Sequence, residues 1–437
     1  MLAQVHSFVL RGIEALACEV EVDVASRGIS KTTIVGLPDA GVKESIERVR
    51  SAMINSGFVF PMTRMTINLA PADLKKEGPV YDLPIAVGLL LAGQAVETQR
   101  HRKLIFAGEL ALDGRLRPIK GAISLAMLAR SVEAEGIVVP LENASEAAAA
   151  TEINVYPADS LATVVAFLNG LRDIEPHPHL DADAALAEAK PPVDFGDVRG
   201  QETVKRALTI AAAGNHNALM IGPAGTGKTM CAKALPGILP PLSRDEALQT
   251  TCIYSAAGLL ASGKALMTTR PYRSPHHTAS SAALVGGGTI PRPGEVSLAH
   301  HGVLFLDELP EFSRAVLETL RQPLEDGQVT VARAHSSIRY PARFMLVAAM
   351  NPTRGGDFAT DETSQRDMDK YLARISGPLV DRIDIHVEVP RVEYKQLAGA
   401  PVGTDTATMR QQVIDARAIQ TQRNGGPLHT NATLSGR

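Results

Sequence analysis

The sequence contains no tryptophan, and aromatic residues make up only 4% of its 437 residues. A nucleic-acid-binding surface built from many stacked aromatic side chains is therefore not expected. Cysteine is also rare, because the chain has only Cys18, Cys231 and Cys252, which lie far apart in the sequence. Such a small and scattered set argues against a disulfide scaffold and indicates a reducing compartment.

Long apolar runs are absent as well. A membrane-spanning helix needs about 18 or more consecutive apolar residues, and the nearest approach, Leu83–Val96, is short and contains two glycines. The first residues lack the basic segment and apolar core of a signal peptide. With 45% hydrophobic and 21% charged residues, the composition is that of a globular protein, which we expect in the cytoplasm without membrane contact. The net charge of -3 means that only a local basic patch could bind nucleic acid.

One change in composition divides the chain. Residues 173–194 are rich in proline, alanine and aspartate and nearly empty of large apolar side chains. This composition predicts a linker at 173–195 with a short helical turn at Ala184–Lys190, and a surface loop within one domain is the alternative. Residues 1–172 alternate strand and helix patterns and predict one compact α/β or α+β domain. Residues 196–392 show the order of elements that is typical of a nucleotide-binding α/β domain.

Hydrophobic periodicity indicates the main elements of both domains. In the first domain it predicts strands at Cys18–Val24, Arg64–Leu69 and Ile105–Ala107, and helices at Val42–Met53, Leu83–Leu91 and Ala122–Ala134. Asp39 is expected to cap the first of these helices. In the second domain it predicts a helix at Gln201–Ala213, a strand at Ala218–Ile221, a helix from Lys228, and buried parallel strands at Val303–Leu306 and Phe344–Ala349.

A glycine-rich motif follows the strand at Ala218–Ile221. It matches the phosphate-binding pattern G-x-x-x-x-G-K-[ST] with Gly222, Pro223, Ala224, Gly225, Thr226, Gly227, Lys228 and Thr229. Glycines let backbone N–H groups turn towards phosphates, and the following helix directs its N-terminus at the negative charge. Lys228 is expected to reach the β- and γ-phosphates, and the Thr229 hydroxyl is expected to ligate Mg²⁺. The motif therefore predicts a site for a nucleoside triphosphate with Mg²⁺.

Polar residues also follow the two buried strands. Ligands of open α/β sheets bind at the carboxyl ends of the strands, so Asp307 is expected to complete the Mg²⁺ shell and Glu308 to polarise the attacking water as a general base. An ordinary turn between strand and helix is the alternative for this pair alone. Asn351 ends the next strand, and its amide is expected to position the water or contact the γ-phosphate. By itself, Asn351 would be read as a turn residue.

An arginine near the end of the second domain is a candidate for contact with a neighbouring subunit. Arg382 would stabilise transition-state charge on that subunit's nucleotide as an arginine finger, and Arg374 is the second candidate. A salt bridge of Arg382 with Asp381 or Asp384 is the alternative.

These motifs resemble those of a known family. Residues 197–390 resemble the AAA+ ATPase module of the magnesium-chelatase subunit family, and nearly the whole chain resembles the YifB/ComM-type magnesium chelatase-like proteins. The matching segments are Asp197–Gln201, Lys205–Leu208, the phosphate-binding loop, Arg273–Thr278, Leu306–Phe312 and Ser376–Pro390. The resemblance implies a ring-forming, hexameric ATPase that binds ATP and Mg²⁺, with Gly200 and Gln201 at the nucleotide. It also implies action on DNA, because the competence-associated members are branch-migration motors in recombination during natural transformation.

The N-terminal domain resembles the proteolytic domain of Lon. Lon-like enzymes carry their serine nucleophile in the segment that corresponds to Gly78–Gly88, and the serine position falls on Val80, which has no hydroxyl. The lysine position falls at or near Ile123, with Lys120 close by. The resemblance therefore implies an α+β protease-like fold that is catalytically inactive and serves assembly or partner binding.

The chain departs from the family pattern at two places. Family members often carry a cysteine-rich, zinc-binding insertion after the Asn-Pro pair, whereas no cysteine occurs here between Asn351 and Arg382, so zinc is not expected. The family also continues into a helical lid that carries a further arginine. Residues 393–437 would form only the start of that lid, so we expect a lid that is truncated and lacks this arginine.

Two basic segments are candidates for contact with DNA. Residues 247–294 contain no aspartate or glutamate but include Arg270 and Arg273, and a hairpin predicted at Val329–Phe344 includes Arg333 and Arg339. Such segments suit phosphate contact, and a solvated or subunit-facing surface is the alternative. The histidine pairs His276–His277 and His300–His301 lack ligand spacing and acidic or cysteine partners, so a metal site is not expected there.

The leading hypothesis is a Mg²⁺-dependent AAA+ motor that hydrolyses ATP and acts on single-stranded or branched DNA. One alternative is the ATPase subunit of magnesium chelatase in tetrapyrrole synthesis, which the Lon-like domain argues against. Another is a nucleotide-binding scaffold without hydrolysis, which the truncated lid favours and the intact Lys228, Asp307 and Glu308 oppose. An ATP-dependent protease ranks last because of Val80.

Overall fold

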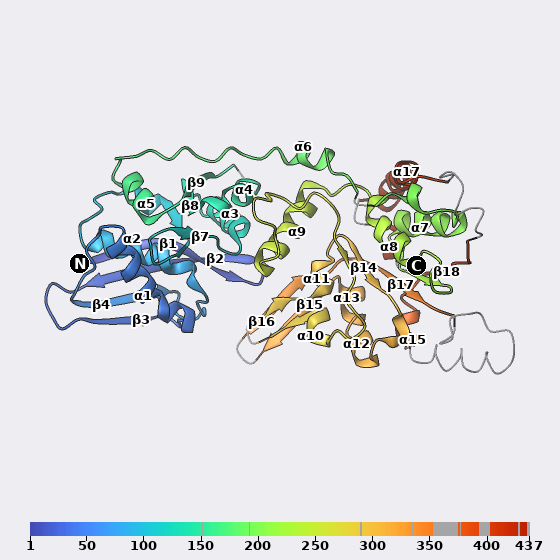
Figure 1. Ribbon diagram of the computed structural model, residues 1–437, viewed down its shortest axis with the longest axis horizontal. Coiled ribbons are helices and arrows are strands. Elements are labelled where there is room, and N and C mark those ends of the chain that lie inside the picture. The colour runs from blue at the N-terminus through green and yellow to red at the C-terminus, as the bar shows by residue number, and fades with distance from the viewer. Residues whose placement is uncertain are drawn as a thin grey trace. The chain divides into compact units, whose positions relative to one another are not determined.

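The computed structural model describes residues 1–150, 152–191, 193–288, 291–333, 336–352, 375, 377–392, 403–426 and 429–434, without the side chains of residues 333 and 336. The chain divides into two compact units, which Figure 1 shows coloured by residue number. The first consists of Met1–Ala182 and Thr251–Met267, and the second consists of Asp183–Thr250 and Thr268–Arg437. The division after Ala182 lies inside the predicted linker at 173–195. The segment Thr251–Met267, which sequence analysis assigns to the nucleotide-binding domain, belongs instead to the first unit.

The first unit is built on a seven-stranded sheet with the order β3-β4-β2-β1-β5-β8-β9. Its strands are β1 (Leu2–Arg11), β2 (Glu14–Val24), β3 (Lys31–Val35), β4 (Arg64–Ala70), β5 (Leu104–Phe106), β8 (Gly136–Pro140) and β9 (Asn154–Ala158). Strand β2 pairs antiparallel with β1 and β4, and the other neighbours pair in parallel. The three strands predicted in this domain are confirmed as β2, β4 and β5, although β2 begins earlier than predicted, at Glu14. A short hairpin of β6 (Glu109–Leu110) and β7 (Leu116–Arg117) completes the strands of this unit.

The helices of the first unit pack on this sheet. Helices α1 (Ala40–Asn55), α2 (Asp82–Ala92) and α5 (Leu161–Leu168) share one hydrophobic core with the strands. Helices α3 (Ala122–Ser131) and α4 (Ala144–Ala148) contact β2, β8 and β9 and contribute no residue to that core. The three predicted helices are therefore confirmed as α1, α2 and α3. The predicted cap is confirmed too, because the Asp39 carboxylate accepts a hydrogen bond from the Val42 N–H at 2.7 Å.

Helix α2 lies unusually close to β2. A Cβ atom added at Gly88 would lie 2.6 Å from Cγ2 of Val22, so only a residue without a side chain fits there. This explains why a glycine interrupts the otherwise apolar helix α2, in which every residue is buried.

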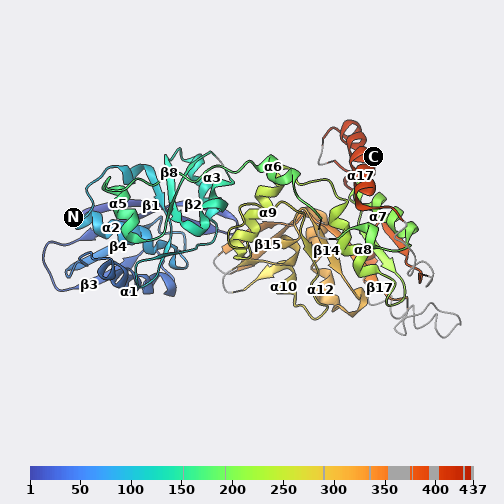
Figure 2. The ribbon, with the colours of Figure 1, turned by 45° about the horizontal axis from the view of Figure 1, so that its top comes forward.

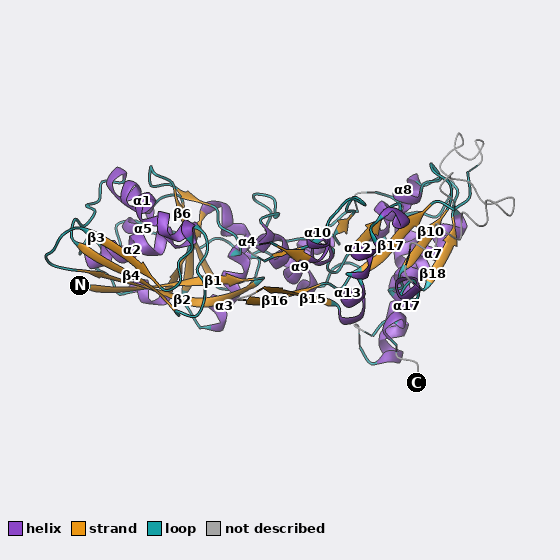
Figure 3. Cartoon of the chain, turned by 90° about the horizontal axis from the view of Figure 1, so that it is seen from below, coloured by secondary structure: helices purple, strands orange, loops and turns teal. Residues whose placement is uncertain are grey.

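The second unit is built on a five-stranded parallel sheet with the order β11-β14-β17-β10-β18. Its strands are β10 (Ala218–Ile221), β11 (Tyr272–Arg273), β14 (Val303–Leu306), β17 (Met345–Met350) and β18 (Ile385–Glu388). Figure 3 shows β17, β10 and β18 side by side. Every residue of β14 and β17 is buried, as the continuous apolar runs predict for central parallel strands.

Helices and two hairpins complete the second unit, although α6 begins in the first unit and α9 ends there. The helices are α6 (Ala182–Ala187), α7 (Glu202–Gly214), α8 (Lys228–Ala234), α9 (Arg244–Ala257), α10 (Ser281–Val285), α11 (Glu295–Leu298), α12 (Arg314–Glu318), α13 (Arg321–Asp326), α15 (Gly377–Val380) and α17 (Thr406–Asn424). The hairpins pair β12 (Gly286–Gly287) with β13 (Arg292–Pro293) and β15 (Gln328–Arg333) with β16 (Ser336–Pro341). The predicted helix before β10 and the hairpin predicted at Val329–Phe344 are confirmed as α7 and β15–β16. Helix α6 stands within the predicted linker, two residues earlier than the predicted turn.

Helix α17 lies in the segment 393–437 that sequence analysis assigns to the start of a lid. It packs alongside α7, as Figure 2 shows. Met409 and Val413 of α17 are buried in the core of the second unit, and the Arg417 guanidinium donates to the Ala212 carbonyl at 2.7 Å. The part of this segment that the structure describes is therefore anchored on the second unit.

A buried carboxylate holds the segment Thr251–Met267 within the first unit. Glu146 of α4 accepts hydrogen bonds from the Ser255 hydroxyl, from the Ile123 N–H at 3.0 Å and from the Asn143 amide at 3.2 Å. The Ser255 oxygen in turn accepts from the Gly121 N–H at 2.8 Å. Burial raises the pKa of Glu146, and these donors oppose that rise. Helix α9 thus begins in the second unit and ends in a buried polar cluster of the first.

Replacing Ser255 with alanine is expected to lower the stability of the first unit by about 1–3 kcal/mol, because Glu146 and the Gly121 amide lose a buried partner. Hydrogen exchange followed by mass spectrometry should show faster exchange of the Gly121 amide. Ser131→Ala is the matched control, since Ser131 is an exposed serine at the end of α3 whose hydroxyl donates only locally, to the Leu128 carbonyl. Unchanged exchange at Gly121 in Ser255→Ala would contradict the assignment of this hydrogen bond.

Candidate active site

The candidate site lies at the carboxyl edge of the five-stranded sheet. Strands β10, β17 and β14 are adjacent and parallel, so their carboxyl ends meet at one edge. Open α/β sheets bind their ligands at this edge. The residues that directly follow the three strands are Gly222, Asn351 and Asp307, all of which the sequence predicts to act on nucleotide or metal.

The loop Gly222–Thr229 joins β10 to α8, and its backbone needs glycine. The φ angles of Gly225 and Gly227 are 78° and 94°, in the left-handed region that costs other residues roughly 1–2 kcal/mol. Gly222 is required for a different reason, since a Cβ there would lie 2.2 Å from the Val389 carbonyl oxygen. Pro223 and Thr226 are buried within the loop, and Ala224 is exposed. The backbone of the loop therefore requires glycine at Gly222, Gly225 and Gly227.

The Lys228 side chain is buried and bonded to the loop itself. Its Nζ donates to the carbonyl oxygens of Gly222 at 2.6 Å and Pro223 at 2.8 Å, and to Asn351 Oδ1 at 3.2 Å. Burial lowers the pKa of Lys228, and the charge of Asp307 opposes that shift. The three acceptors are neutral oxygens, so phosphate oxygens would give stronger, charge-assisted bonds.

The two predicted Mg²⁺ ligands lie next to each other. Thr229 Oγ1 donates to Asp307 Oδ2 at 2.9 Å, which joins the start of α8 to the end of β14. Mg²⁺ prefers oxygen ligands and is usually held by one or two protein groups together with substrate phosphates and water. The hydroxyl and carboxylate present at this position fit that description.

Glu308 has a constrained backbone and an accessible side chain. Its φ is 53°, in the left-handed region, and its N–H donates to Asp307 Oδ1 at 3.0 Å. Its Oε2 lies 3.2 Å from Nδ1 of His277, and the side chain remains 55% exposed. From the sequence, His277 is considered within a basic segment, within a motif shared with the family and as a metal ligand, but not as a neighbour of Glu308. The available signal is position, because His277 and Glu308 each stand a few residues beyond the end of adjacent parallel strands.

Gln201 links the phosphate-binding loop to the end of β18. Its amide nitrogen donates to the Thr226 carbonyl at 3.1 Å and to the Pro390 carbonyl at 2.7 Å. Gly200 and Gln201 both have positive φ angles, of 62° and 59°, directly before α7. Of the pair predicted to lie at the nucleotide, Gln201 is therefore hydrogen-bonded to the loop Gly222–Thr229.

Arg382 lies at the surface of the second unit. Its guanidinium is 2.6 Å from Glu325, and the Arg382 side chain is 50% exposed. This partner is neither of the two aspartates considered from the sequence. Arg374, the second candidate for an arginine finger, lies outside the described residues.

The structure gives two of the four DNA-contact candidates intramolecular partners. Arg270 is nearly buried and donates to three backbone carbonyls and to Glu246 at 3.0 Å. Arg273 forms two hydrogen bonds with Glu295, at 2.6 and 2.7 Å. The two acids stand immediately outside the acid-free stretch 247–294. A count of charges within that stretch therefore misses the acids that neutralise Arg270 and Arg273. These arginines are poor candidates for binding DNA phosphates, whereas Arg339 on β16 is exposed and the Arg333 side chain lies outside the description.

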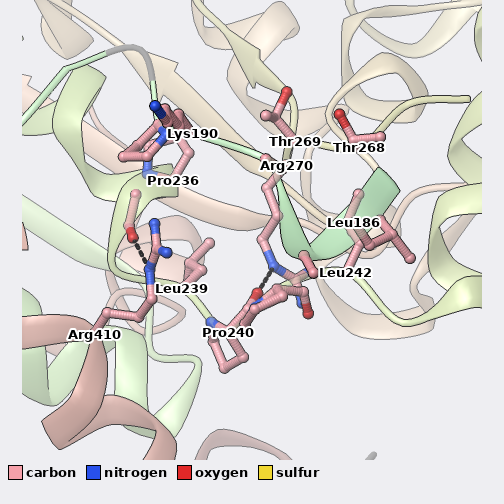
Figure 4. Close-up of a pocket in the computed structure, with 15 residues that line it drawn as sticks. Leu186, Lys190, Pro236, Leu239, Pro240, Leu242, Thr268, Thr269, Arg270 and Arg410 are labelled. Atoms are coloured by element: carbon pink, nitrogen blue, oxygen red, sulfur yellow. Dashed lines mark hydrogen bonds between the residues drawn. The ribbon is translucent and has the colours of Figure 1, made fainter. Parts of the chain in front are cut away.

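A small cavity in the second unit lies apart from the loop Gly222–Thr229 and from the residues that follow β14 and β17. It has a volume of about 90 Å³, too small for a nucleotide, and no residue of the phosphate-binding loop lines it. Figure 4 shows that Lys190, Pro236, Arg270 and Arg410 surround it and that Arg270 points to the carbonyl of Pro240. The cavity therefore does not compete with the sheet edge as the candidate site.

Other expectations concern metals and membranes. The described residues contain no group of three or more His, Cys, Asp or Glu side chains arranged to hold a metal ion. The segment between Pro352 and Ile375, where the family's zinc insertion would begin, lies outside the described residues. None of the helices in the described parts of the chain is long and apolar enough to span a membrane.

Two protein-family models match the chain. The family described as magnesium chelatase, subunit ChlI, matches residues 194–397, and the family described as subunit ChlI of Mg-chelatase matches residues 20–143.

Known proteins are similar over most of the chain. The uncharacterised protein YifB of Salmonella typhimurium is 47% identical over 440 residues, which cover 100% of this chain and 85% of that protein. The competence protein ComM of Haemophilus influenzae is 45% identical over 428 residues, covering 97% of this chain and 84% of that protein. The magnesium-chelatase 38 kDa subunit of Rhodobacter capsulatus is 29% identical over 196 residues, covering 40% of this chain and 55% of that subunit.

Replacing Lys228 with alanine is expected to weaken ATP binding by roughly 10- to 150-fold, because a charge-assisted hydrogen bond contributes about 1.5–3 kcal/mol. Titration with a fluorescent ATP analogue measures the change. Lys233→Ala is the matched control, since Lys233 is an exposed lysine on the same helix. Equal affinities of wild type and Lys228→Ala would rule out this loop as the phosphate site.

Proposed function

Because the chain belongs to the YifB/ComM family of magnesium chelatase-like proteins, we propose that it binds ATP with Mg²⁺ and hydrolyses it to drive a motor that acts on DNA. The observation that carries the proposal is the convergence of Lys228, Thr229, Asp307 and Asn351 at the phosphate-binding loop. Two hydrogen bonds tie these residues together across β10, β14 and β17.

The geometry supports a division of roles in hydrolysis. Thr229 and Asp307 are the residues that would hold Mg²⁺, which would supply positive charge to offset the negative charge of the phosphates. Lys228 would exchange neutral carbonyl partners for the β- and γ-phosphates. Glu308 would orient the attacking water and accept its proton, and the Asn351 amide would fix the γ-phosphate or the water.

A ring of subunits, which we take to be hexameric, would complete the site. Arg382 is exposed at the surface and its ion pair with Glu325 joins two half-exposed side chains. Surface ion pairs contribute only about 0–1 kcal/mol, so a neighbouring subunit's phosphate would displace Glu325 at little cost. This supports Arg382 as the arginine finger.

The first unit would serve assembly or partner binding as an inactive protease-like domain. The position that would need a nucleophile is Val80, which packs against the hydrophobic core and has no hydroxyl. Hydrolysis of peptides is therefore not part of the proposed function.

Action on DNA rests on two lines of support. One relative over nearly the whole chain is named a competence protein. The hairpin β15–β16 stands between β14 and β17 in the sequence and exposes Arg339. We place DNA contact at this hairpin, in recombination or natural transformation, and leave Arg270 and Arg273 out of it.

A role as the ATPase subunit of a magnesium chelatase is the second candidate. It is supported by the two chelatase family models and by the similarity to the 38 kDa subunit of Rhodobacter capsulatus. That similarity covers only 40% of this chain, whereas the family members with the first unit match nearly all of it. The DNA motor is therefore the better-supported reading.

ATP turnover by the purified chain tests the main proposal. We expect Mg²⁺-dependent hydrolysis that single-stranded or branched DNA stimulates, and a loss of about 100-fold or more in Glu308→Gln, the usual range for removing a general base. ATP binding without turnover would instead favour a nucleotide-dependent scaffold. An equal rate of ATP hydrolysis with and without DNA would contradict the proposed DNA motor and favour the role in a magnesium chelatase.

Replacing Arg339 with alanine is expected to weaken DNA binding across all sequences and to reduce the salt slope of the binding constant by about 1, because one phosphate contact is lost. Fluorescence anisotropy with labelled DNA at several salt concentrations measures both. Arg314→Ala removes an exposed arginine from α12 and serves as the control. An identical slope for wild type and Arg339→Ala would remove the hairpin from the DNA site.

A further inference from the structure

The small cavity of the second unit has cations around it. Lys190, Arg270 and Arg410 line it, as Figure 4 shows, and none of the described residues that line it is an aspartate or a glutamate. Its volume of about 90 Å³ is several times larger than the roughly 10–15 Å³ that one water molecule needs. The cavity therefore has room for a small polyatomic ion, and the charges of its walls favour an anion.

The positive charge around the cavity is only partly balanced. Arg270 has a carboxylate partner, because its guanidinium donates to Glu246 at 3.0 Å. A further cation stands on the same acid, however. Burial lowers the pKa of Arg417 to about 10, and the charge of Arg270 adds to this fall whereas that of Glu246 opposes it. One carboxylate thus serves two arginines, which leaves an excess of positive charge beside the cavity.

Lys190 and Arg410 have no carboxylate partner in the described parts of the chain. The Nε of Arg410 donates to the Gly237 carbonyl at 2.6 Å. Among the described residues, neither its two terminal nitrogens nor the Lys190 Nζ has a hydrogen-bond or ion-pair partner. Both side chains are partly buried, and charges that leave water are normally paired. These two groups are therefore available to an anion in the cavity.

Close packing fixes the segments that carry these two cations. A Cβ atom added at Gly237 would lie 2.9 Å from Cβ of Pro191 and 3.0 Å from Cγ2 of Thr406, so the linker, the turn after α8 and α17 meet without spare room. The Thr406 N–H donates to Asp194 at 3.0 Å, and the Thr406 hydroxyl accepts from the Phe195 N–H at 2.7 Å. A site whose walls are already ordered binds its ligand at a lower entropic cost.

We propose that this cavity binds a free, small oxyanion of the phosphate class between Lys190 and Arg410. Ammonium and guanidinium groups are the usual partners of phosphate oxygens, and the charges of these two side chains match a dianion. The bound anion joins the linker, which carries Lys190, to α17, which carries Arg410. The cavity lies apart from the phosphate-binding loop, so this second anion site goes beyond the proposed function and does not depend on ATP hydrolysis.

Hydrogen exchange of the full chain in inorganic phosphate, compared with chloride at the same ionic strength, tests the proposal. We expect phosphate to slow exchange in the turn Leu235–Gly237 and in the first turn of α17, because an anion that binds the folded form stabilises it by mass action. The slowing should reach about 10-fold at a phosphate concentration of about ten times the dissociation constant. Phosphate at the loop Gly222–Thr229 is recognised separately, by slower exchange of that loop.

Two variants assign the effect to the cavity. Lys190→Gln and Arg410→Gln each remove one of the two unpaired charges. For each we expect the dissociation constant of phosphate at the cavity to rise about 10-fold or more, as the loss of one charge-assisted hydrogen bond predicts. The matched controls are Lys233→Gln, which alters an exposed lysine of α8, and Arg423→Gln, which alters an exposed arginine at the far end of α17. Both should leave the constant unchanged.

Three results would overturn the proposal. One is equal exchange of Leu235–Gly237 and α17 in phosphate and in chloride. Another is protection of these segments that persists unchanged in both Lys190→Gln and Arg410→Gln. The third is protection by a DNA duplex in the absence of free phosphate, which would assign the cavity to DNA phosphates. None of these results requires ATP turnover, so they are distinguishable from a failure of the proposed function.

Discussion

The parallel pairing of β14 and β17, with β10 on the far side of β17, is the constraint on which the site depends. Each of these strands carries its functional group just past its last buried residue. A slip of one residue between β14 and β17 would move Asp307 by about 3.3 Å along the strand, beyond hydrogen-bond reach of Thr229. It would also turn the buried side chains of one strand to the opposite face of the sheet, against different neighbours in the core. Because every residue of both strands is buried, the hydrophobic core that stabilises the fold also sets the distances at the site.

The parts of the molecule that sequence predicts well are those with local causes. The Asp39 cap, the strand β2 with its alternating buried valines, and the loop Gly222–Thr229 each depend on neighbours within a few residues. The pairing of Thr229 with Asp307 was predictable for a related reason. The two residues follow β10 and β14, which lie on either side of β17 in one parallel sheet, so both stand at the carboxyl edge where such sheets bind their ligands.

Interactions between residues that lie far apart in the sequence were not predictable in the same way. The same holds for a partner that lies just outside the stretch whose charges are counted. The stretch 247–294 looks basic because it contains no acid, yet Glu246 and Glu295 flank it and bind Arg270 and Arg273. His277 looked like half of a weak metal motif because its strand, β11, has only two residues and gives almost no periodic signal. In both cases the sequence shows the type of the side chain, a cation or an imidazole ring. Which residue it contacts depends on tertiary packing, which the sequence pattern does not show.

Helix α9 has a consequence for how the protein can change over evolution. It starts in the unit that carries the phosphate-binding loop, and its last turn, which contains Ser255, belongs to the first unit together with the buried Glu146. Gene recombination with a distant homologue could replace only the part of the chain that contains Glu146, or only the part that contains Ser255. The remaining residue of the pair would then lose its hydrogen-bond partner. The two halves are therefore inherited under a shared constraint, and substitutions at the end of α9 are expected to be accompanied by compensating substitutions around Glu146.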